Sequence, residues 1–396
     1  MITSLVLAAV ALSHSPLASW EEPDLAAVEA RGVQILLAMQ ENYELSEPRR
    51  GMKGTEVEGA GEPGREWPYE GVYREARRIP PGYRVGGTSI CALALLESRD
   101  YTADPKVAEA VERGLDFVLE HLDIEAMGPG FSGGYDVRGW GHTYALEFML
   151  RLRALKAVPE VRADDVDERI TWLVDVIMDS QLAGKTGGWN YSHRGDGGPA
   201  SPFMTGPTLL ALWEAQAQGE TLVDKVVERA LDALENCRLK DGSIPYTSAG
   251  KGSFMDQRPG AMGRMAITEV VLLHAGRSKP ERVEDAIKCF FEHWDQLEVR
   301  RRQNGTHIQP YGVAPYYVFY AHRYVAQAIE HLPKRLRKKY RTLFLERIFS
   351  NQEESGGWND RVFPRSENYG TAMALLALRQ PDLPALAGPK TAVRKR

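Results

Sequence analysis

The stretches "DSQLAGKTGGWN" (Asp179–Asn190) and "SNQEESGGWNDR" (Ser350–Arg361) share one pattern. Each ends an amphipathic, helix-like run with a glutamine, and a Gly-Gly-Trp-Asn sequence follows a few residues later. Internal similarity of this kind indicates a chain built from structural repeats. Weaker copies of the pattern are Gly133-Gly134-Tyr135, Asp241-Gly242-Ser243 and a long first insertion that reaches Trp67.

Six apolar runs, most of them led by a glycine, recur along the chain at intervals of about 50 to 65 residues, a spacing typical of supersecondary repeats. They are GTSICALALL (from Gly87), GHTYALEFML (from Gly141), TGPTLLALWEA (from Thr205), GRMAITEVVLLH (from Gly263), GVAPYYVFYAHRYVAQAI (from Gly312) and GTAMALLALR (from Gly370). Because these runs are apolar on nearly every side, each is predicted to form a helix that is buried all round.

Six amphipathic runs alternate with the apolar ones and begin near residues 24, 104, 164, 221, 280 and 335. Their apolar residues recur at i, i+3, i+4 and i+7, and several runs start on Asp or Pro, as helices do. Six buried helices inside six half-exposed ones predict an all-α fold, a single (α/α)6 toroid over residues 20–384. An insertion at 43–83 is expected to lie across its mouth. An open superhelical solenoid is the alternative, but its exposed concave face does not suit such apolar helices.

The Gly-Gly-Trp sequence falls in the loop that runs from an outer helix to the next inner helix. Glycines permit a sharp reversal of the chain there. The tryptophan is expected to cover the gap between neighbouring hairpins, with its indole N–H on a hydrogen-bond partner. The glutamine that closes the outer helix is expected to bond the loop backbone or to stack on the indole.

These repeats resemble the Q-W repeats of the superfamily of squalene/hopene cyclases and protein-prenyltransferase β-subunits, over residues 24–380. The resemblance implies a toroid whose central cavity opens at one end. The acidic D-x-D-D motif of those cyclases is absent, since the nearest string, Asp164-Asp165-Val166-Asp167, starts an outer helix and is explained by capping. The Asp-x-Cys zinc motif of the prenyltransferases is absent too, because Ser89 stands two residues before Cys91. We therefore expect no metal and no cofactor.

In such a toroid the inner helices begin at one mouth, where their unpaired N–H groups attract anions. The sequence thus predicts a squalene-cyclase-like and prenyltransferase-like repeat protein whose central cavity binds an isoprenoid-like or anionic-headed apolar ligand, with catalysis left open. Two other function classes stay open. One is a secreted polysaccharide lyase or hydrolase on an (α/α)6 barrel, and the other is a non-catalytic toroid that binds a partner.

Alignment of the inner helices on their leading glycine places polar residues in the first turn, toward the mouth, at Thr88, His142, Arg264 and Thr371. Glu147 and Glu269 match one turn deeper, and a carboxylate in an apolar helix is costly unless it is paired or functional. For Glu147, an ion pair with Arg151 is the structural alternative. The expected catalytic residues, as acid and base, are Asp136, His142, Glu147 and Glu269.

The expected ligand-binding residues combine polar side chains of the mouth loops with an aromatic wall on the fifth inner helix. They are Trp140, Asn190, His193, Arg264, His307, Tyr311, Tyr316, Tyr320, Asp360 and Tyr369. Turn formation explains Asn and Asp in loops equally well, and core packing explains the tyrosines.

The chain has 396 residues and a formal net charge of −5, which does not favour nucleic acid or an anionic membrane as partner. Residues 1–19 resemble a secretory signal peptide, with an apolar run too short to span a bilayer. We expect export to the periplasm or the extracellular space, and a cytoplasmic protein otherwise. Cys91, Cys237 and Cys289 are predicted as buried thiols. Residues 385–396 are expected to form a disordered basic tail, and the oligomeric state stays open.

Overall fold

The computed structural model describes residues 23–48, 50–53, 61–71, 73–183, 186–192, 198–250, 252–301, 303, 305–361 and 363–389. The expected signal peptide, His193 and residues 390–396 of the expected tail lie outside the described residues. Within these ranges no helix has the length and apolar character needed to cross a membrane.

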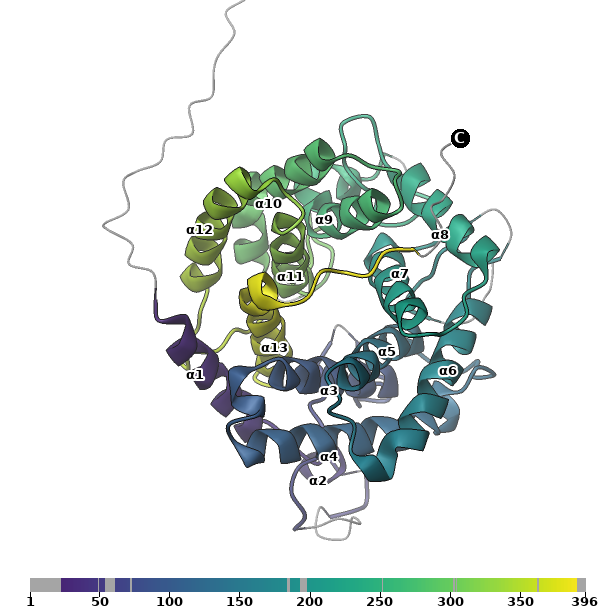
Figure 1. Ribbon diagram of the computed structural model, residues 1–396, viewed down its shortest axis with the longest axis vertical. Coiled ribbons are helices and arrows are strands. Elements are labelled where there is room, and N and C mark those ends of the chain that lie inside the picture. Colours follow the sequence, from purple (N-terminus) through teal and green to yellow (C-terminus); the bar gives the residue numbers. More distant parts are fainter. Residues whose placement is uncertain are drawn as a thin grey trace, which may run out of the picture.

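The helices form two concentric rings, as Figure 1 shows. The outer ring contains α1 (Leu25–Ala38), α4 (Pro105–Leu122), α6 (Ala163–Asp179), α8 (Asp224–Cys237), α10 (Pro280–Arg301) and α12 (Lys334–Ser350). The inner ring contains α3 (Pro81–Leu96), α5 (Arg138–Ala154), α7 (Pro202–Ala217), α9 (Arg258–His274), α11 (Tyr317–Ile329) and α13 (Ser366–Arg379). Only isolated β-bridges occur among the described residues, so the prediction of an all-α (α/α)6 toroid is confirmed.

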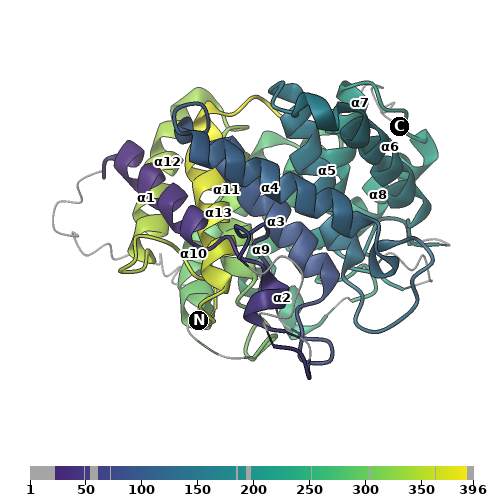
Figure 2. The same cartoon turned by 90° about the horizontal axis from the view of Figure 1, so that it is seen from below.

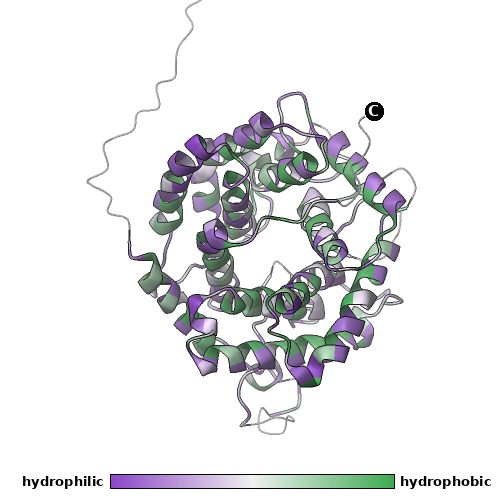
Figure 3. Cartoon of the chain, viewed as in Figure 1, coloured by the Kyte–Doolittle hydropathy of each residue, from purple (hydrophilic) through white to green (hydrophobic). Residues whose placement is uncertain are grey.

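The two rings differ in polarity as the sequence pattern predicts. Inner helices such as α3 and α9 are buried along almost their whole length, whereas α4 and α8 bury one face. The hydropathy colouring of Figure 3 shows hydrophobic residues concentrated on the inner helices and on the inward faces of the outer ones. Each inner helix packs against its two neighbours, and α13 packs against α3 and α1, so the ring is closed.

Three tryptophans, Trp67, Trp189 and Trp358, make the same two hydrogen bonds in three different loops. The peptide N–H of each donates to a threonine hydroxyl on the next inner helix, with distances of 2.9 Å to Thr88, 3.0 Å to Thr205 and 3.0 Å to Thr371. The indole N–H donates to a carbonyl of the preceding outer helix, at 2.6 Å to Leu36, 2.7 Å to Ile177 and 2.8 Å to Ile348. Each tryptophan therefore joins an outer helix to the inner helix that follows it.

The glutamines of the repeat also bond backbone carbonyls. Gln40 and Gln181 donate to the next outer helix, at 2.9 Å to Ala110 and 2.7 Å to Val226, whereas Gln352 donates at 2.7 Å to Gly356 in its own loop. The first two therefore link neighbouring hairpins on the outside of the ring.

The two ends of the toroid differ (Figure 2). Helix α2 (Tyr43–Ser46) and the first insertion lie at the end where the inner helices begin, which we call the mouth. At the other end, residues 383–389 run from α13 across the ring toward α7, and Leu386 and Ala387 pack against the core. Residues 385–389, which the sequence assigns to a disordered tail, are thus ordered on the toroid.

Candidate functional site

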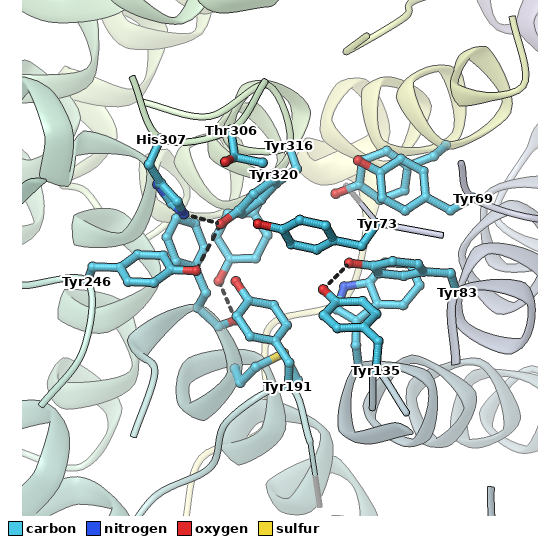
Figure 4. A pocket seen from close by; sticks show the side chains of 14 residues that line it. Tyr69, Tyr73, Tyr83, Tyr135, Tyr191, Tyr246, Thr306, His307, Tyr316 and Tyr320 are labelled. Carbon is cyan, nitrogen blue, oxygen red and sulfur yellow. Dashed lines mark hydrogen bonds between the residues drawn. The ribbon is translucent and has the colours of Figure 1, made fainter. Parts of the chain in front are cut away.

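Aromatic side chains surround a cavity of about 130 Å³ at the mouth of the toroid, which we call the mouth pocket (Figure 4). Nine tyrosines, one tryptophan and one phenylalanine contribute to its wall. The lining residues are Tyr69, Tyr73, Tyr83, Tyr135, Trp140, Tyr191, Phe203, Met204, Tyr246, Thr306, His307, Tyr316, Tyr320 and Tyr369.

The wall is built from three parts of the chain. The inner helices contribute residues near their first turns, including Tyr83 of α3, Trp140 of α5 and Phe203 of α7. The loops between hairpins and the described part of the first insertion contribute most of the others. Gly86 makes room for the wall, because a Cβ there would lie 2.3 Å from the Trp140 ring.

A chain of hydrogen bonds orders one side of the mouth pocket. His307 Nδ1 donates to the Gly312 carbonyl at 2.9 Å, and since a carbonyl only accepts, the neutral ring has an unprotonated Nε2. Tyr316 therefore donates its hydroxyl to that nitrogen at 3.2 Å, and Tyr246 donates to the Tyr316 hydroxyl at 3.0 Å. Burial lowers the pKa of His307 and raises that of Tyr316, which favours the neutral form of both groups.

Other hydroxyl groups of the mouth pocket are less engaged. The hydroxyls of Tyr83 and Tyr135 lie 3.1 Å apart and form a hydrogen bond on the opposite wall. The Tyr191 hydroxyl is buried and has no hydrogen-bond partner among the described residues. It is the group of the pocket wall that most needs a partner from a ligand or from water.

Asp360 lies behind the wall and reaches the mouth pocket through Tyr69. The Tyr69 hydroxyl donates to Asp360 Oδ2 at 2.9 Å, while Oδ1 has no partner among the described residues. Asp360 is fully buried, and burial raises the pKa of its carboxyl to about 7, against the lowering effect of Arg361. A carboxyl with this pKa exchanges protons near neutral pH, so the pair is suited to acid–base chemistry.

Some of the residues expected from the sequence to bind a ligand lie in this wall. They are Trp140, His307, Tyr316, Tyr320 and Tyr369, and Asp360 adjoins them through Tyr69. Asn190 instead closes a turn, with its amide bonded to Pro199 O and Tyr191 N. Tyr311 is half-buried against the core and is not part of the lining.

The expected catalytic pair Asp136 and His142 lies outside the mouth pocket. Asp136 caps the start of α5 through the Arg138 N–H at 3.0 Å and forms an ion pair with the Arg138 side chain at 3.1 Å. His142 Nε2 donates to Met127 O at 2.9 Å, and its ring packs on Trp172 of the outer helix α6. Burial lowers the pKa of His142 to about 3, which keeps it neutral. Both positions suit structural contacts.

The two glutamates and Arg264 also lie outside the lining of the mouth pocket. Glu269 accepts two hydrogen bonds from Arg238, at 2.7 and 2.8 Å, and Glu147 pairs with Arg323 rather than with Arg151. Arg264 donates to three carbonyls, those of Ile244, Gly260 and Met255. Like His142, Arg264 holds the incoming loop at the position where three other repeats use threonine.

Helix geometry explains why the alignment on the leading glycine missed the wall. Residues two apart on a helix point in nearly opposite directions, because each residue turns the chain by about 100°. Thr205 and Thr371 face the loop, so Phe203 and Tyr369, two positions earlier, face the mouth pocket. The sequence signal for a wall residue was therefore an aromatic residue two positions before the residue that faces the loop. Trp140, two positions before His142, follows the same rule.

Metal binding has no support in the geometry. Across the described ranges, no group of three or more His, Cys, Asp or Glu side chains is arranged to hold a metal ion. The three cysteines are buried, as expected.

Comparison with known proteins supports the fold. No protein-family model matches the chain, and no curated protein sequence matches it. The Lin0763 protein from Listeria innocua superposes with a TM-score of 0.55 at 11% identity, over 90% of this chain and 97% of its own. An inactive variant of α-1,6-mannanase GH76A of Salegentibacter sp. HEL1_6, in complex with α-1,6-mannotetrose, has a TM-score of 0.53 at 11% identity, over 90% and 99%.

A third solved structure, the type II terpene cyclase MstE from Scytonema, has a TM-score of 0.49 at 13% identity, over 91% of this chain and 98% of its own. At these identities the first two likenesses show the fold alone. The part of the resemblance that concerns fold, an α/α toroid, is confirmed.

Proposed function

We propose that the protein binds an apolar, isoprenoid-like ligand at the mouth of its toroid. The aromatic wall of the mouth pocket is the observation that carries the proposal. Ring faces offer apolar surface, and each Å² of apolar surface removed from water stabilises the complex by about 25 cal/mol. A cavity of about 130 Å³ suits the end of such a ligand, with the rest of the chain directed out through the mouth.

The proposal assigns different regions to the two parts of the ligand. Among its described lining residues the mouth pocket has no Lys, Arg, Asp or Glu, which supports binding of the apolar part there. An anionic head group would lie at the rim, near the positive N-terminal ends of the inner helices. Tyr69 and Asp360 are the groups best placed to exchange a proton with the bound ligand, so we propose them, rather than Asp136, His142, Glu147 and Glu269, for any catalytic role.

A neutral sugar ring is the second candidate. The unpartnered Tyr191 hydroxyl and the hydroxyl chain of Tyr246 and Tyr316 favour it, because sugar rings stack on aromatic faces and need hydrogen-bond partners at their edges. This candidate corresponds to the carbohydrate-active alternative that the sequence left open.

Isothermal titration of the purified protein with geraniol, geranyl diphosphate and methyl α-mannoside separates these possibilities. We expect one of the two isoprenoids to bind, and Trp140→Ala to weaken that binding at least tenfold. Tyr340→Phe is the matched control, because the Tyr340 hydroxyl bonds Glu284 on the outer ring and its loss should leave binding unchanged. Binding of the sugar alone would favour the second candidate, and binding of none of the three would refute both.

A further inference from the structure

A second cavity, of about 340 Å³, lies at the end of the toroid opposite the mouth, and we call it the far-end cavity. Residues 383–387 cross this end and line it (Figure 1). One turn of α11 separates the two cavities, since Tyr320 lines the mouth pocket and Tyr324 lines the far-end cavity. The two sites are therefore distinct.

The walls of the far-end cavity suit a hydrocarbon chain. Their apolar side chains come from five inner helices and from the C-terminal segment, and include Leu93, Leu210, Leu376, Leu383 and Leu386. An apolar cavity of roughly 150 Å³ is known to hold benzene. The far-end cavity, at about 340 Å³, is larger and has room for a chain of several carbons together with a polar head.

Charged groups stand within this apolar lining. Glu147 of α5 pairs with Arg323 of α11, and Glu97, directly after α3, pairs with Arg151 of α5. Glu214 adds a third carboxylate, so the lining has one more carboxylate than guanidinium groups. The C-terminal ends of the inner helices also lie at this end, and their carbonyls add negative potential. The field in the far-end cavity therefore favours a cation.

Two polar groups of the far-end cavity can accept hydrogen bonds from an occupant. Gln327 lines the cavity, is only 6% exposed, and its amide oxygen has no hydrogen-bond partner among the described residues. A buried amide oxygen without a hydrogen bond is unfavourable, and an occupant that donates to it would remove this cost. Glu147 uses Oε1 for Arg323, and its side chain is 33% exposed, so the carboxylate can also accept a hydrogen bond from an occupant. Both groups point to an occupant that donates hydrogen bonds.

We infer that the far-end cavity binds an amphipathic amine, with a protonated amino group near Glu147 and Gln327 and an alkyl chain beneath residues 383–387. An anionic amphiphile is disfavoured, because Arg323 already has Glu147 as its partner. The site is independent of the proposed ligand at the mouth.

Titration calorimetry at pH 7 with octylamine, octanol and sodium octanoate tests this inference, because the three share one chain and differ in charge. We expect octylamine to bind with a Kd at least tenfold lower than that of either relative. Gln327→Leu should weaken octylamine binding several-fold, and Ala211→Phe, which places a ring into the cavity from α7, should abolish it. Tyr191→Phe, at the mouth, is the control and should leave it unchanged.

Thermal melts of each variant show whether it is folded, and Gln327→Leu, which keeps the size of the side chain, remains informative if Ala211→Phe is unstable. Equal or tighter binding of octanoate or octanol would overturn the inference. Failure of octylamine to bind would also overturn the inference, since water would then be the only occupant. Unchanged octylamine binding in folded Gln327→Leu and Ala211→Phe would overturn it as well.

Discussion

Tyr69 and Asp360 are joined by a hydrogen bond of 2.9 Å although 291 positions separate them in the sequence. Tyr69 belongs to the first insertion, and Asp360 belongs to the loop of the last repeat. The bond therefore connects the first and last hairpins of the ring at the wall of the mouth pocket, and it places a buried carboxyl beside that pocket.

The raised pKa of Asp360, about 7, should make stability depend on pH. An unfolded Asp has a pKa of about 3.9, so between pH 4 and 7 only the folded state holds this proton, and its contribution to the free energy of unfolding falls as pH rises. Asp360→Asn lacks this dependence. We expect the variant's free energy of unfolding, relative to wild type, to rise across this window by up to about 4 kcal/mol and to level off above pH 7.

Urea unfolding at several pH values measures that difference, and the comparison with wild type cancels the other titrating groups. Asp382→Asn makes the same substitution at a side chain that is 55% exposed, and as the control it should change the free energy of unfolding only slightly. A flat difference for Asp360→Asn would contradict the raised pKa.

Replacing Thr205 by Val should destabilise the fold by about 1–3 kcal/mol, because the buried peptide N–H of Trp189 loses its acceptor. Thr205→Ser keeps the hydroxyl and should recover most of the loss. Thr342→Val on the exposed side of α12 makes the same chemical change and should have little effect. Chemical denaturation compares the three, and equal effects of both valine variants would exclude this role for the threonine.

Gly187→Ala should be more harmful than Gly276→Ala. Both glycines have positive φ, +62° and +70°, so both variants incur backbone strain of about 1–3 kcal/mol. Only at Gly187 would the new Cβ also meet protein, 2.4 Å from the Arg229 carbonyl oxygen. We expect a further loss of about 1–3 kcal/mol from this overlap. Melting curves with matched conditions provide the test, and similar losses at both positions would contradict it.

Removing one partner of the ion pair between Glu147 and Arg323 should destabilise the protein more than removing both partners. Glu147→Gln leaves a buried guanidinium unpaired and should cost up to about 3 kcal/mol, since the Glu147 side chain is one-third exposed. Adding Arg323→Met removes the unpaired charge and should restore much of the loss. Urea unfolding of the two singles and the double gives the coupling energy, which would be near zero if the pair were irrelevant.

The fold could be predicted because its repeats are local. Each apolar run and each amphipathic run reveals its own helix, and the positions of Trp189 and Trp358 locate the loops between them. The tryptophan of the long insertion, Trp67, makes the same contacts in spite of the longer loop. The same pair of tryptophan hydrogen bonds therefore recurs around the ring wherever the tryptophan recurs in the sequence.

The candidate site was only half predictable, because its contacts are not local. Glu269 looked unpaired, yet its partner Arg238 lies 31 residues earlier, at the end of the preceding outer helix. Tyr69 and Tyr83 became part of the wall only when the insertion folded over the mouth. Polar character in the first turn marked residues that hold loops, such as His142, while the wall was marked by aromatic residues on the opposite side of the same helices.

Closure of the ring through α13, α3 and α1 has a consequence for how the protein assembles. Linear helical arrays can gain or lose units, because their terminal units carry polar outer faces. Here every hairpin is an interior unit with two neighbours, so deletion of any hairpin would expose the apolar faces of both neighbours. Shortened versions should therefore aggregate instead of forming smaller folded proteins, and evolution can vary the loops of this protein far more readily than the number of its hairpins.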